Sequence, residues 1–236
     1  MKEESREGAV PSEPPVPLPR RTGERKSPDL RREEILDATI RLVARKGFAA
    51  VTLRDVATDV GVAHGLLRHY FGDRDELIAA AFDRAAAEEM ATATDADGDT
   101  LSPAALIRVV AEWLTATPRD HYLVWIDAWS EAPRNTALLD SLRRHHLDCE
   151  RRLTRLIEEG ADAKVFTLVK PAADISSFLT ALADGLAVQQ HAIGVIDAES
   201  YDNTVFEYAE HALGLPPRSL SLADVDHHTR GSWVDA

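Results

Sequence analysis

Basic side chains are concentrated in one short part of this chain, where they could contact a polyanion. The 236 residues carry 27 basic and 40 acidic groups, a formal net charge of -13. Residues 20–74 hold 12 basic and 8 acidic groups, a balance of +4, whereas residues 1–19 and 75–236 carry -2 and -15. This asymmetry predicts a polyanion-binding module attached to an acidic body with a different role. Chance clustering on a solvated face is the alternative.

A second group of candidate side chains is aromatic and lies in the acidic part of the chain. Trp113, Tyr122, Trp125 and Trp129 fall within 17 residues, and the last three are spaced to share one face of a helix. Aromatic faces suit a flat or cationic ligand through stacking or cation–π contact. A pocket wall and ordinary core packing are both open interpretations. The residues expected to line an effector pocket are Trp113, Tyr122, Trp125, Trp129 and Phe178.

The sequence contains none of the common catalytic motifs. It has no Walker loop, no glycine-rich dinucleotide turn, no Gly-x-Ser-x-Gly elbow and no His-Glu-x-x-His. His145 and Cys149 are four residues apart, but two ligands without a third make a poor metal site. We therefore expect no enzyme activity, metal or cofactor. The alternative is a helical enzyme or metal-binding protein whose N-terminal unit is only a packed hairpin.

Two short helices joined by a glycine turn underlie the basic segment. Thr52 and Asp55 form a capping box that starts the first helix, which runs to Val60. Gly61 supplies the turn, and the second helix is expected over residues 63–70. This arrangement is a helix-turn-helix unit. An ordinary helical hairpin has the same pattern, and the coincidence with the basic segment favours the helix-turn-helix.

Helical spacing continues on both sides of this unit. One helix precedes it and ends at Gly47, and another starts at a capping box formed by Asp73 and Glu76. Residues 164–169 are compatible with a short strand and more readily with a loop. The remaining helices are expected over 102–116, 119–131, 134–159, 171–193 and 200–213. The predicted fold class is all-α: a three-helix N-terminal helix-turn-helix domain followed by a larger helical domain for ligand binding and dimerisation.

Composition sets the expected domain boundaries. Six prolines mark residues 1–28 as an extended arm. Its basic end, formed by Arg20, Arg21, Arg25 and Lys26, is interpreted as a minor-groove arm or a solvated linker. The expected domains are the arm at 1–28, the helix-turn-helix domain at 29–74, the effector-binding and dimerisation domain at 75–215 and a flexible tail at 216–236.

Membrane and secretory signals are missing from the sequence. The longest stretch free of Asp, Glu, Lys and Arg covers the 12 residues 185–196, against the ~18 needed for a membrane span. The N-terminus has charges where a signal peptide needs an apolar region. The single cysteine, Cys149, excludes an intrachain disulfide. These features predict a cytoplasmic protein without a membrane partner.

Residues 29–76 resemble the TetR family of one-component transcriptional repressors. The residues that carry the resemblance are Ile35-Leu36-Asp37-Ala38, Gly47-Phe48, Thr52-Leu53-Arg54-Asp55-Val56-Ala57, Gly61-Val62, Gly65-Leu66-Leu67, His69-Tyr70-Phe71 and Asp75-Glu76-Leu77. In the C-terminal half, Trp125-Ile126-Asp127-Ala128-Trp129 and Ala183-Asp184-Gly185-Leu186-Ala187-Val188-Gln189 resemble the subgroup of the choline-sensing betaine repressor. The resemblance implies a homodimeric repressor that leaves a palindromic DNA operator when it binds a small-molecule effector. The aromatic residues described above favour an aromatic or cationic effector.

The helix over residues 63–70 is expected to read DNA from the major groove. His64 and Arg68 are placed at base edges, where an arginine can contact guanine in bidentate fashion, and Gly65 lets the backbone approach closely. Many family members have Ser or Thr where this chain has Ala63, which cannot cap the helix or donate to phosphate. The resemblance implies contacts to phosphate, or support of the helix, by Thr52, Arg54, His69, Tyr70 and Arg74.

The helix over residues 171–193 carries a broad apolar stripe. In the family that the chain resembles, the last two helices pair across a twofold axis as a four-helix bundle. The residues expected at that dimer contact are Phe178, Leu182, Leu186, Gln189, Phe206 and Leu213. A monomer core uses the same kind of stripe, so periodicity leaves both interpretations open. The helix from Arg74 to Met90 joins the two domains and is expected to transmit the effector signal.

Overall fold

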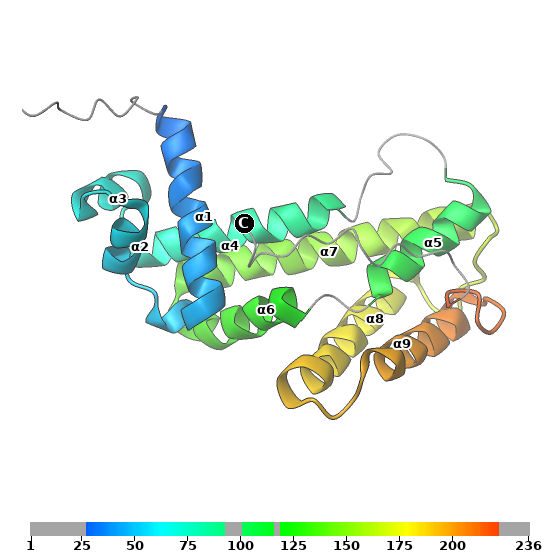
Figure 1. Cartoon of the computed structure of the whole chain (residues 1–236). Coiled ribbons are helices and arrows are strands. Elements are labelled where there is room, and N and C mark those ends of the chain that lie inside the picture. Colours follow the sequence, from blue (N-terminus) through cyan, green and yellow to red (C-terminus); the bar gives the residue numbers. More distant parts are fainter. Residues whose placement is uncertain (1–26, 93–100, 116–118, 222–236) are drawn as a thin grey trace, which may run out of the picture.

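The computed structural model of the chain describes residues 27–92, 101–115 and 119–221, and within them the side chains of all but 88–92 and 119–121. The described residues contain no strand, which confirms the all-α prediction (Figure 1). The basic arm at 20–26 and most of the predicted tail lie outside them. The elements are α1 (Pro28–Lys46), η1 (Phe48–Ala50), α2 (Leu53–Val60), α3 (His64–Phe71), α4 (Arg74–Thr92), α5 (Pro103–Leu114), α6 (Arg119–Glu131), η2 (Ala132–Arg134), α7 (Thr136–Asp162), α8 (Ala172–Ala187), the π-helical η3 (Val188–Ile193) and α9 (Ala198–Leu213).

Local capping explains where the first helices begin and end. The Thr52 hydroxyl accepts from the Asp55 backbone N–H at 3.2 Å, and the Asp55 carboxylate accepts from the Thr52 N–H at 3.0 Å. This is the predicted capping box. Gly61 ends α2 in the left-handed conformation, with φ 71°. At the start of α4, the Asp73 carboxylate accepts from the Glu76 N–H at 2.9 Å. The helix-turn-helix therefore forms as predicted.

Two apolar cores hold the described residues together. The first joins buried side chains of α1 to α4 with others from α6 and the start of α7, such as Val124, Ala128 and Leu142. The second joins α5, α8 and α9 with the later part of α7, through residues such as Leu153, Leu179 and Val205. Since α4, α6 and α7 contribute to the first core, the helix-turn-helix packs directly against the larger helical body.

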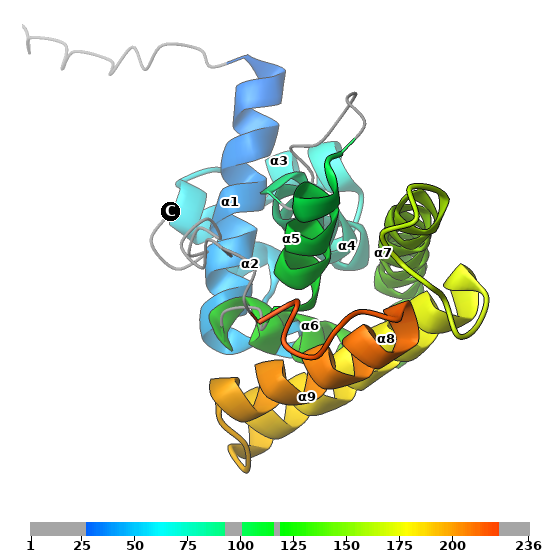
Figure 2. The same ribbon diagram turned by 90° about the vertical axis from the view of Figure 1, so that its right-hand side faces the viewer.

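The long helix α7 connects the two ends of the molecule. It runs beside α4 and then packs on α8, whereas α2 and α3 lie at the far end from α8 and α9 (Figure 1). α8 and α9 lie side by side along one edge of the molecule (Figure 2). Residues 164–169 form a loop rather than a strand, with the Thr167 N–H donating to the Leu213 carbonyl at 2.8 Å. Among the described helices, none is both long and apolar enough to cross a membrane.

The predicted helix over 171–193 is continuous, but its helix type changes along its length. It is α-helical to Ala187 and π-helical from Val188 to Ile193, where Gly194 ends it with φ 72°. A π-helical turn inserts extra residues into the α-helical repeat, so it rotates the side chains that follow. His191 is thereby buried against α6.

Candidate nucleic-acid interface and ligand site

One face of α3 is exposed and carries the residues predicted to contact DNA. His64, Gly65, Arg68 and His69 are all exposed, at the spacing of a single helix face. The opposite face is anchored by Leu67 and Phe71, which are buried in the first core. Packing thus fixes how α3 projects from the molecule. The polar face of α3 stays exposed, so the helix could enter the major groove of DNA.

The basic residues of this unit divide into paired and available groups. Arg41 and Arg45 contact the Asp59 carboxylate at 3.3 and 3.8 Å, and Lys46 contacts the Asp55 carboxylate at 3.2 Å. The exposed guanidinium groups of Arg54 and Arg68 form no ion pair among the described residues. The positive charge available to a polyanion is therefore centred on α2 and α3 rather than on α1.

Two other predicted DNA contacts, Thr52 and Tyr70, have structural roles that are visible here. Thr52 caps α2 yet remains exposed. Tyr70 is half-buried against the first core, and its ring contacts that of His69 at a centroid distance of 5.7 Å. α3 begins at His64 with Ala63 as its N-cap, and no side chain caps it. The missing cap agrees with the expectation from Ala63.

Two alternative roles are predicted for Arg74, and its guanidinium group is turned into the molecule. Its Nε donates to the Val51 carbonyl at 2.8 Å, and Nη2 donates to the Phe48 carbonyl. Nη1 lies 2.9 Å from Asp75 and 3.6 Å from Glu131. With its donors used in this way, Arg74 positions the loop before α2, and the structure favours the supporting role over a phosphate contact.

Three of the predicted pocket aromatics meet in one row with a histidine. The ring of Trp129 lies 6.4 Å from that of Trp125 and 5.9 Å from that of Tyr122, and Tyr122 lies 5.5 Å from His191 of η3. Trp129 packs against both apolar cores. We call Trp125, Trp129, Tyr122 and His191 the aromatic row. The Tyr122–Trp129 contact is edge-to-face and the other two are tilted. Aromatic rings are the groups that bind organic cations through their π faces.

A carboxylate lies beside the aromatic row. The Tyr122 hydroxyl donates to the backbone carbonyl of Asp184 at 2.8 Å. Burial raises the pKa of Asp184 to about 6, with His146 lowering it and Glu150 raising it. Burial also raises the pKa of Tyr122, and the negative charge of Asp184 adds to that effect. A desolvated carboxylate near aromatic faces is a suitable environment for an organic cation.

Two of the predicted pocket residues do not join this group. Trp113, on α5, packs against the second core and has no ring contact in the described part of the chain. Phe178 is 52% exposed on the outer face of α8, where its ring lies 6.2 Å from that of Tyr208 on α9. The placement of Phe178 in a pocket is wrong, because its side chain points away from the interior.

The predicted dimer residues also separate into two sets. Phe206 and Leu213 are 7% and 0% exposed within a single chain, where they pack in the second core. Their assignment to the dimer contact is corrected for that reason. Leu182 and Leu186 are half-buried, while Phe178 and Gln189 are exposed. Tyr208 is also exposed, at 50%, and extends this outer face onto α9.

Asp184 and His191 are candidate site residues that the sequence did not predict. Asp184 has a recognisable signal, since it is the only Asp, Glu, Lys or Arg between residues 175 and 196. A single charge in a long apolar helix is rarely accidental. His191 has no such signal, because the π-helical turn that brings it to Tyr122 is not visible in the periodicity. Among the described residues, no three His, Cys, Asp or Glu side chains are grouped to hold a metal ion.

A helix-turn-helix unit with an exposed second helix, fused to a helical body, is the architecture of a DNA-binding transcription regulator. Residues 35–81 match the family described as "Bacterial regulatory proteins, tetR family", and residues 103–214 match "BetI-type transcriptional repressor, C-terminal". The chain belongs to the TetR family, with a C-terminal domain of the BetI type. It is a sequence-specific transcription regulator rather than an enzyme.

Individual relatives agree with this assignment. The HTH-type transcriptional regulator BetI of Burkholderia thailandensis is 32% identical over 168 residues, which are 67% of this chain and 80% of the relative. The TetR transcription regulator from Haloarcula marismortui superposes with a TM-score of 0.68 at 25% identity, covering 78% of this chain and 99% of its own. A transcriptional regulator from Saccharomonospora viridis, solved in complex with choline, has a TM-score of 0.63 at 21% identity and covers 78% and 97%.

Proposed function

We propose that two copies of this chain bind a palindromic operator through α3 and release it when an organic cation binds at the aromatic row. The observation that carries the DNA part is the exposed face of α3, on which Arg68 forms no ion pair among the described residues. Arg68 then reads a base edge and Arg54 contacts phosphate. His64, Gly65 and His69 complete that surface, with Thr52, Tyr70 and Arg74 as its support.

Dimerisation explains why the operator should be palindromic. Symmetry-related copies of α3 meet two half-sites about one helical turn apart, ~34 Å. The outer face formed by Phe178, Leu182, Leu186, Gln189 and Tyr208 lies at the opposite end of the molecule from α3 (Figure 1). Two exposed aromatic rings on an otherwise well-packed helix pair support this face as the contact between copies.

The effector chemistry follows from charge and aromaticity. Tyr122 and Trp129 supply aromatic rings, and Asp184 supplies a partly buried negative charge. A quaternary ammonium group suits both features. The choline complex of the Saccharomonospora viridis regulator is a precedent within the same fold. Because ionised Asp184 is the form that attracts a cation, we expect cation affinity to fall as the pH drops through about 6.

The operator is tested by selecting duplexes from a random-sequence pool with the purified protein. We expect enrichment of one inverted repeat with half-sites one turn apart, and binding that weakens as salt is raised. Enrichment of no sequence over competing nonspecific DNA would contradict the regulator function.

The effector is tested by calorimetric titration with choline and with 3,3-dimethylbutan-1-ol, the neutral analogue in which carbon replaces the ammonium nitrogen. We expect choline to bind and the neutral analogue to bind at least about tenfold more weakly, because it lacks the charge that Asp184 attracts. Equal binding of the two compounds would contradict a cation site.

A further inference from the structure

The peptide unit of Phe48 is held from two sides by two different helices. The Asp127 carboxylate, on α6, accepts the Phe48 backbone N–H, and the Arg74 guanidinium group, on α4, donates to the Phe48 carbonyl. The Arg74 Nε also holds the Val51 carbonyl at 2.8 Å. The loop between α1 and α2 is therefore fixed to α6 on its donor side and to α4 on its acceptor side.

The sequence around Phe48 allows this close approach. Gly47 has φ +80°, and a Cβ atom at that position would lie 3.0 Å from the Asp127 carboxylate oxygen. A residue with a side chain would strain the backbone and crowd Asp127. Glu131, one turn along α6 from Asp127, lies 3.6 Å from Arg74 and is itself buried. α6 thus holds the loop directly through Asp127 and indirectly through Arg74.

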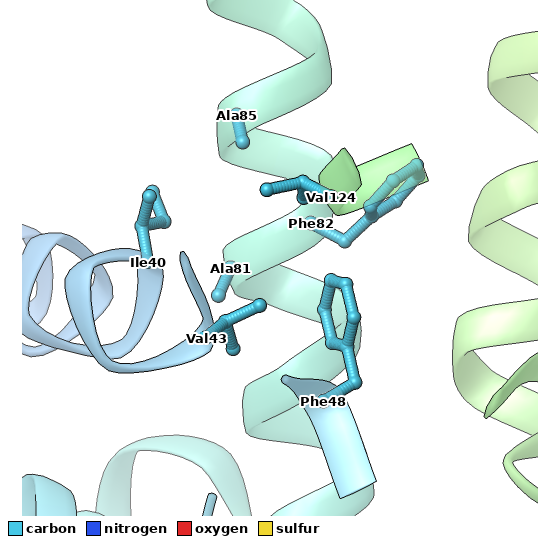
Figure 3. Close-up of a pocket in the computed structure, with 7 residues that line it drawn as sticks. All are labelled: Ile40, Val43, Phe48, Ala81, Phe82, Ala85 and Val124. Carbon is cyan, nitrogen blue, oxygen red and sulfur yellow. The ribbon is translucent and has the colours of Figure 1, made fainter. Parts of the chain in front are cut away.

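The Phe48 side chain lies on the other side of this attachment. It is buried but borders a small apolar recess between α1, α4 and α6 (Figure 3). The ring lies 6.2 Å from that of Phe82, which lies 4.9 Å from Trp125 of the aromatic row. The residues that line the recess are Ile40, Val43, Phe48, Ala81, Phe82, Ala85 and Val124.

We propose that Asp127, through its hydrogen bond to the Phe48 peptide, is the positioning residue that couples α6 to the DNA-binding unit. α6 carries Tyr122, Trp125 and Trp129, so a ligand at the aromatic row displaces the helix that holds Asp127. The displaced carboxylate carries Phe48 toward the recess, and the attached loop changes the angle of α2, which starts at Leu53. The inference deepens the proposed function and rests on it.

The test compares Asp127→Ala and Asp127→Asn with the wild type and with Asp162→Ala, which alters an exposed aspartate at the far end of α7. Thermal unfolding and mass in solution check folding and dimerisation. We then measure the dissociation constant for choline in the absence of DNA. The dissociation constant for the selected operator duplex is measured twice, without choline and at saturating choline. The coupling between choline and operator binding is the ratio of these two operator constants.

We expect choline affinity to stay within about twofold of wild type in all variants, because the hydrogen bond of Asp127 goes to the Phe48 peptide rather than to a side chain of the aromatic row. The coupling ratio should fall at least about fivefold in Asp127→Ala, fall less in Asp127→Asn, which keeps an acceptor oxygen, and remain unchanged in Asp162→Ala. If the Asp127 hydrogen bond only stabilised the fold, its loss would lower the free energy of unfolding and leave the coupling ratio unchanged. An unchanged ratio in a folded Asp127→Ala or Asp127→Asn protein would overturn the proposal.

A second readout needs no effector and separates this inference from the choline proposal. Operator binding should change hydrogen exchange in α6 amides 122–131 of the wild type, since coupling is reciprocal. In Asp127→Ala, or in Asp127→Asn if the alanine variant does not fold, the α6 change should shrink while the α3 change persists. An α6 response absent from the wild type, or equal in wild type and variant, would overturn the coupling role even if choline does not bind.

Discussion

At the scale of single residues, the protein separates charges that stabilise the fold from charges that remain available. Arg41, Arg45 and Lys46 are neutralised by acidic groups of α2, whereas Arg54 and Arg68 are not paired in the described part of the chain. Asp184 carries the opposite charge in the opposite environment. It is a carboxylate whose burial is unfavourable in the absence of a cation. Both kinds of charge lie where a ligand is expected.

Replacing Arg68 by alanine should remove base discrimination. A bidentate contact to guanine contributes about 1 to 3 kcal/mol, so operator affinity should fall about 5- to 150-fold while affinity for nonspecific DNA changes little. Fluorescence anisotropy with operator and scrambled duplexes measures both. Arg54→Ala is the matched comparison, because loss of a phosphate contact weakens binding to both duplexes and reduces the salt slope by about 1. Arg68→Ala that keeps wild-type discrimination would remove this assignment.

The titration of Asp184 should be visible in stability. Its folded-state pKa of about 6 lies above the ordinary 3.8, so folding favours the protonated form. That stability is fully present below pH 4 and is lost as the pH rises through about 6. Asp184→Asn should therefore be more stable than wild type at pH 7.5, by at most about 3 kcal/mol, and nearly equal at pH 4. Urea unfolding measures the difference.

Asp174→Asn, at an exposed position in the first turn of the same helix, is the control and should show no such gain. A stability difference between Asp184→Asn and wild type that is the same at pH 4 and pH 7.5 would show that Asp184 is not the titrating group.

At the scale of elements, caps and packing faces explain how the site is built. α2 has a complete capping box, but α3 begins at Ala63 without a side-chain cap. The position of α3 thus depends more on the burial of Leu67 and Phe71 in the core than on capping at its N-terminus. α8 and α9 bury one side in the second core and expose Phe178 and Tyr208 on the other.

Supplying the missing cap should stabilise the protein. Ala63→Ser places a hydroxyl where it can accept a backbone N–H of the first turn of α3, worth about 1 kcal/mol. Thermal unfolding should show a higher midpoint. Ala44→Ser, at an exposed position inside α1, is the control and should lower stability, because serine is a weaker helix former than alanine. A midpoint that falls in Ala63→Ser would indicate that the start of α3 differs from the one described.

The outer face of α8 and α9 is tested by charge. Phe178→Glu should weaken the dimer by about 2 kcal/mol or more, about 30-fold, because a carboxylate would be buried at the contact. Sedimentation velocity over a range of concentrations measures the dissociation constant. Leu30→Glu, which changes a side chain 60% exposed at the opposite end of the molecule, should leave it unchanged. Equal dimer stability in Phe178→Glu and wild type would move the interface elsewhere.

At the scale of the whole molecule, the sequence predicts the helices better than it predicts their partners. Spacing, Gly61 and the Thr52 capping box identify the helix-turn-helix, because these signals are local. The apolar stripe of the last two helices is also visible, but its inner and outer faces are not. Phe206 and Leu213 belong to the chain's own core, whereas Phe178 is exposed, and only tertiary packing decides between them.

Polar contacts between residues that are far apart in the sequence could not be predicted from it. Asp127 and Phe48 are 79 positions apart, and nothing in either neighbourhood indicates that they meet. The fold brings the aromatic row, α6 and the loop before α2 into one connected path. The net charge of -13 comes mainly from the larger helical body, whereas the segment with a local surplus of positive charge is the one that contains the helix-turn-helix.

The measurement that tests this account most directly is an operator titration with and without choline. The selected operator duplex is titrated with the wild-type dimer at fixed salt, first alone and then at saturating choline. We expect tight, sequence-specific binding that weakens about 5- to 150-fold when choline is present. Operator affinity that is identical in the two titrations, with choline bound, would contradict the account of a repressor released by a cationic effector.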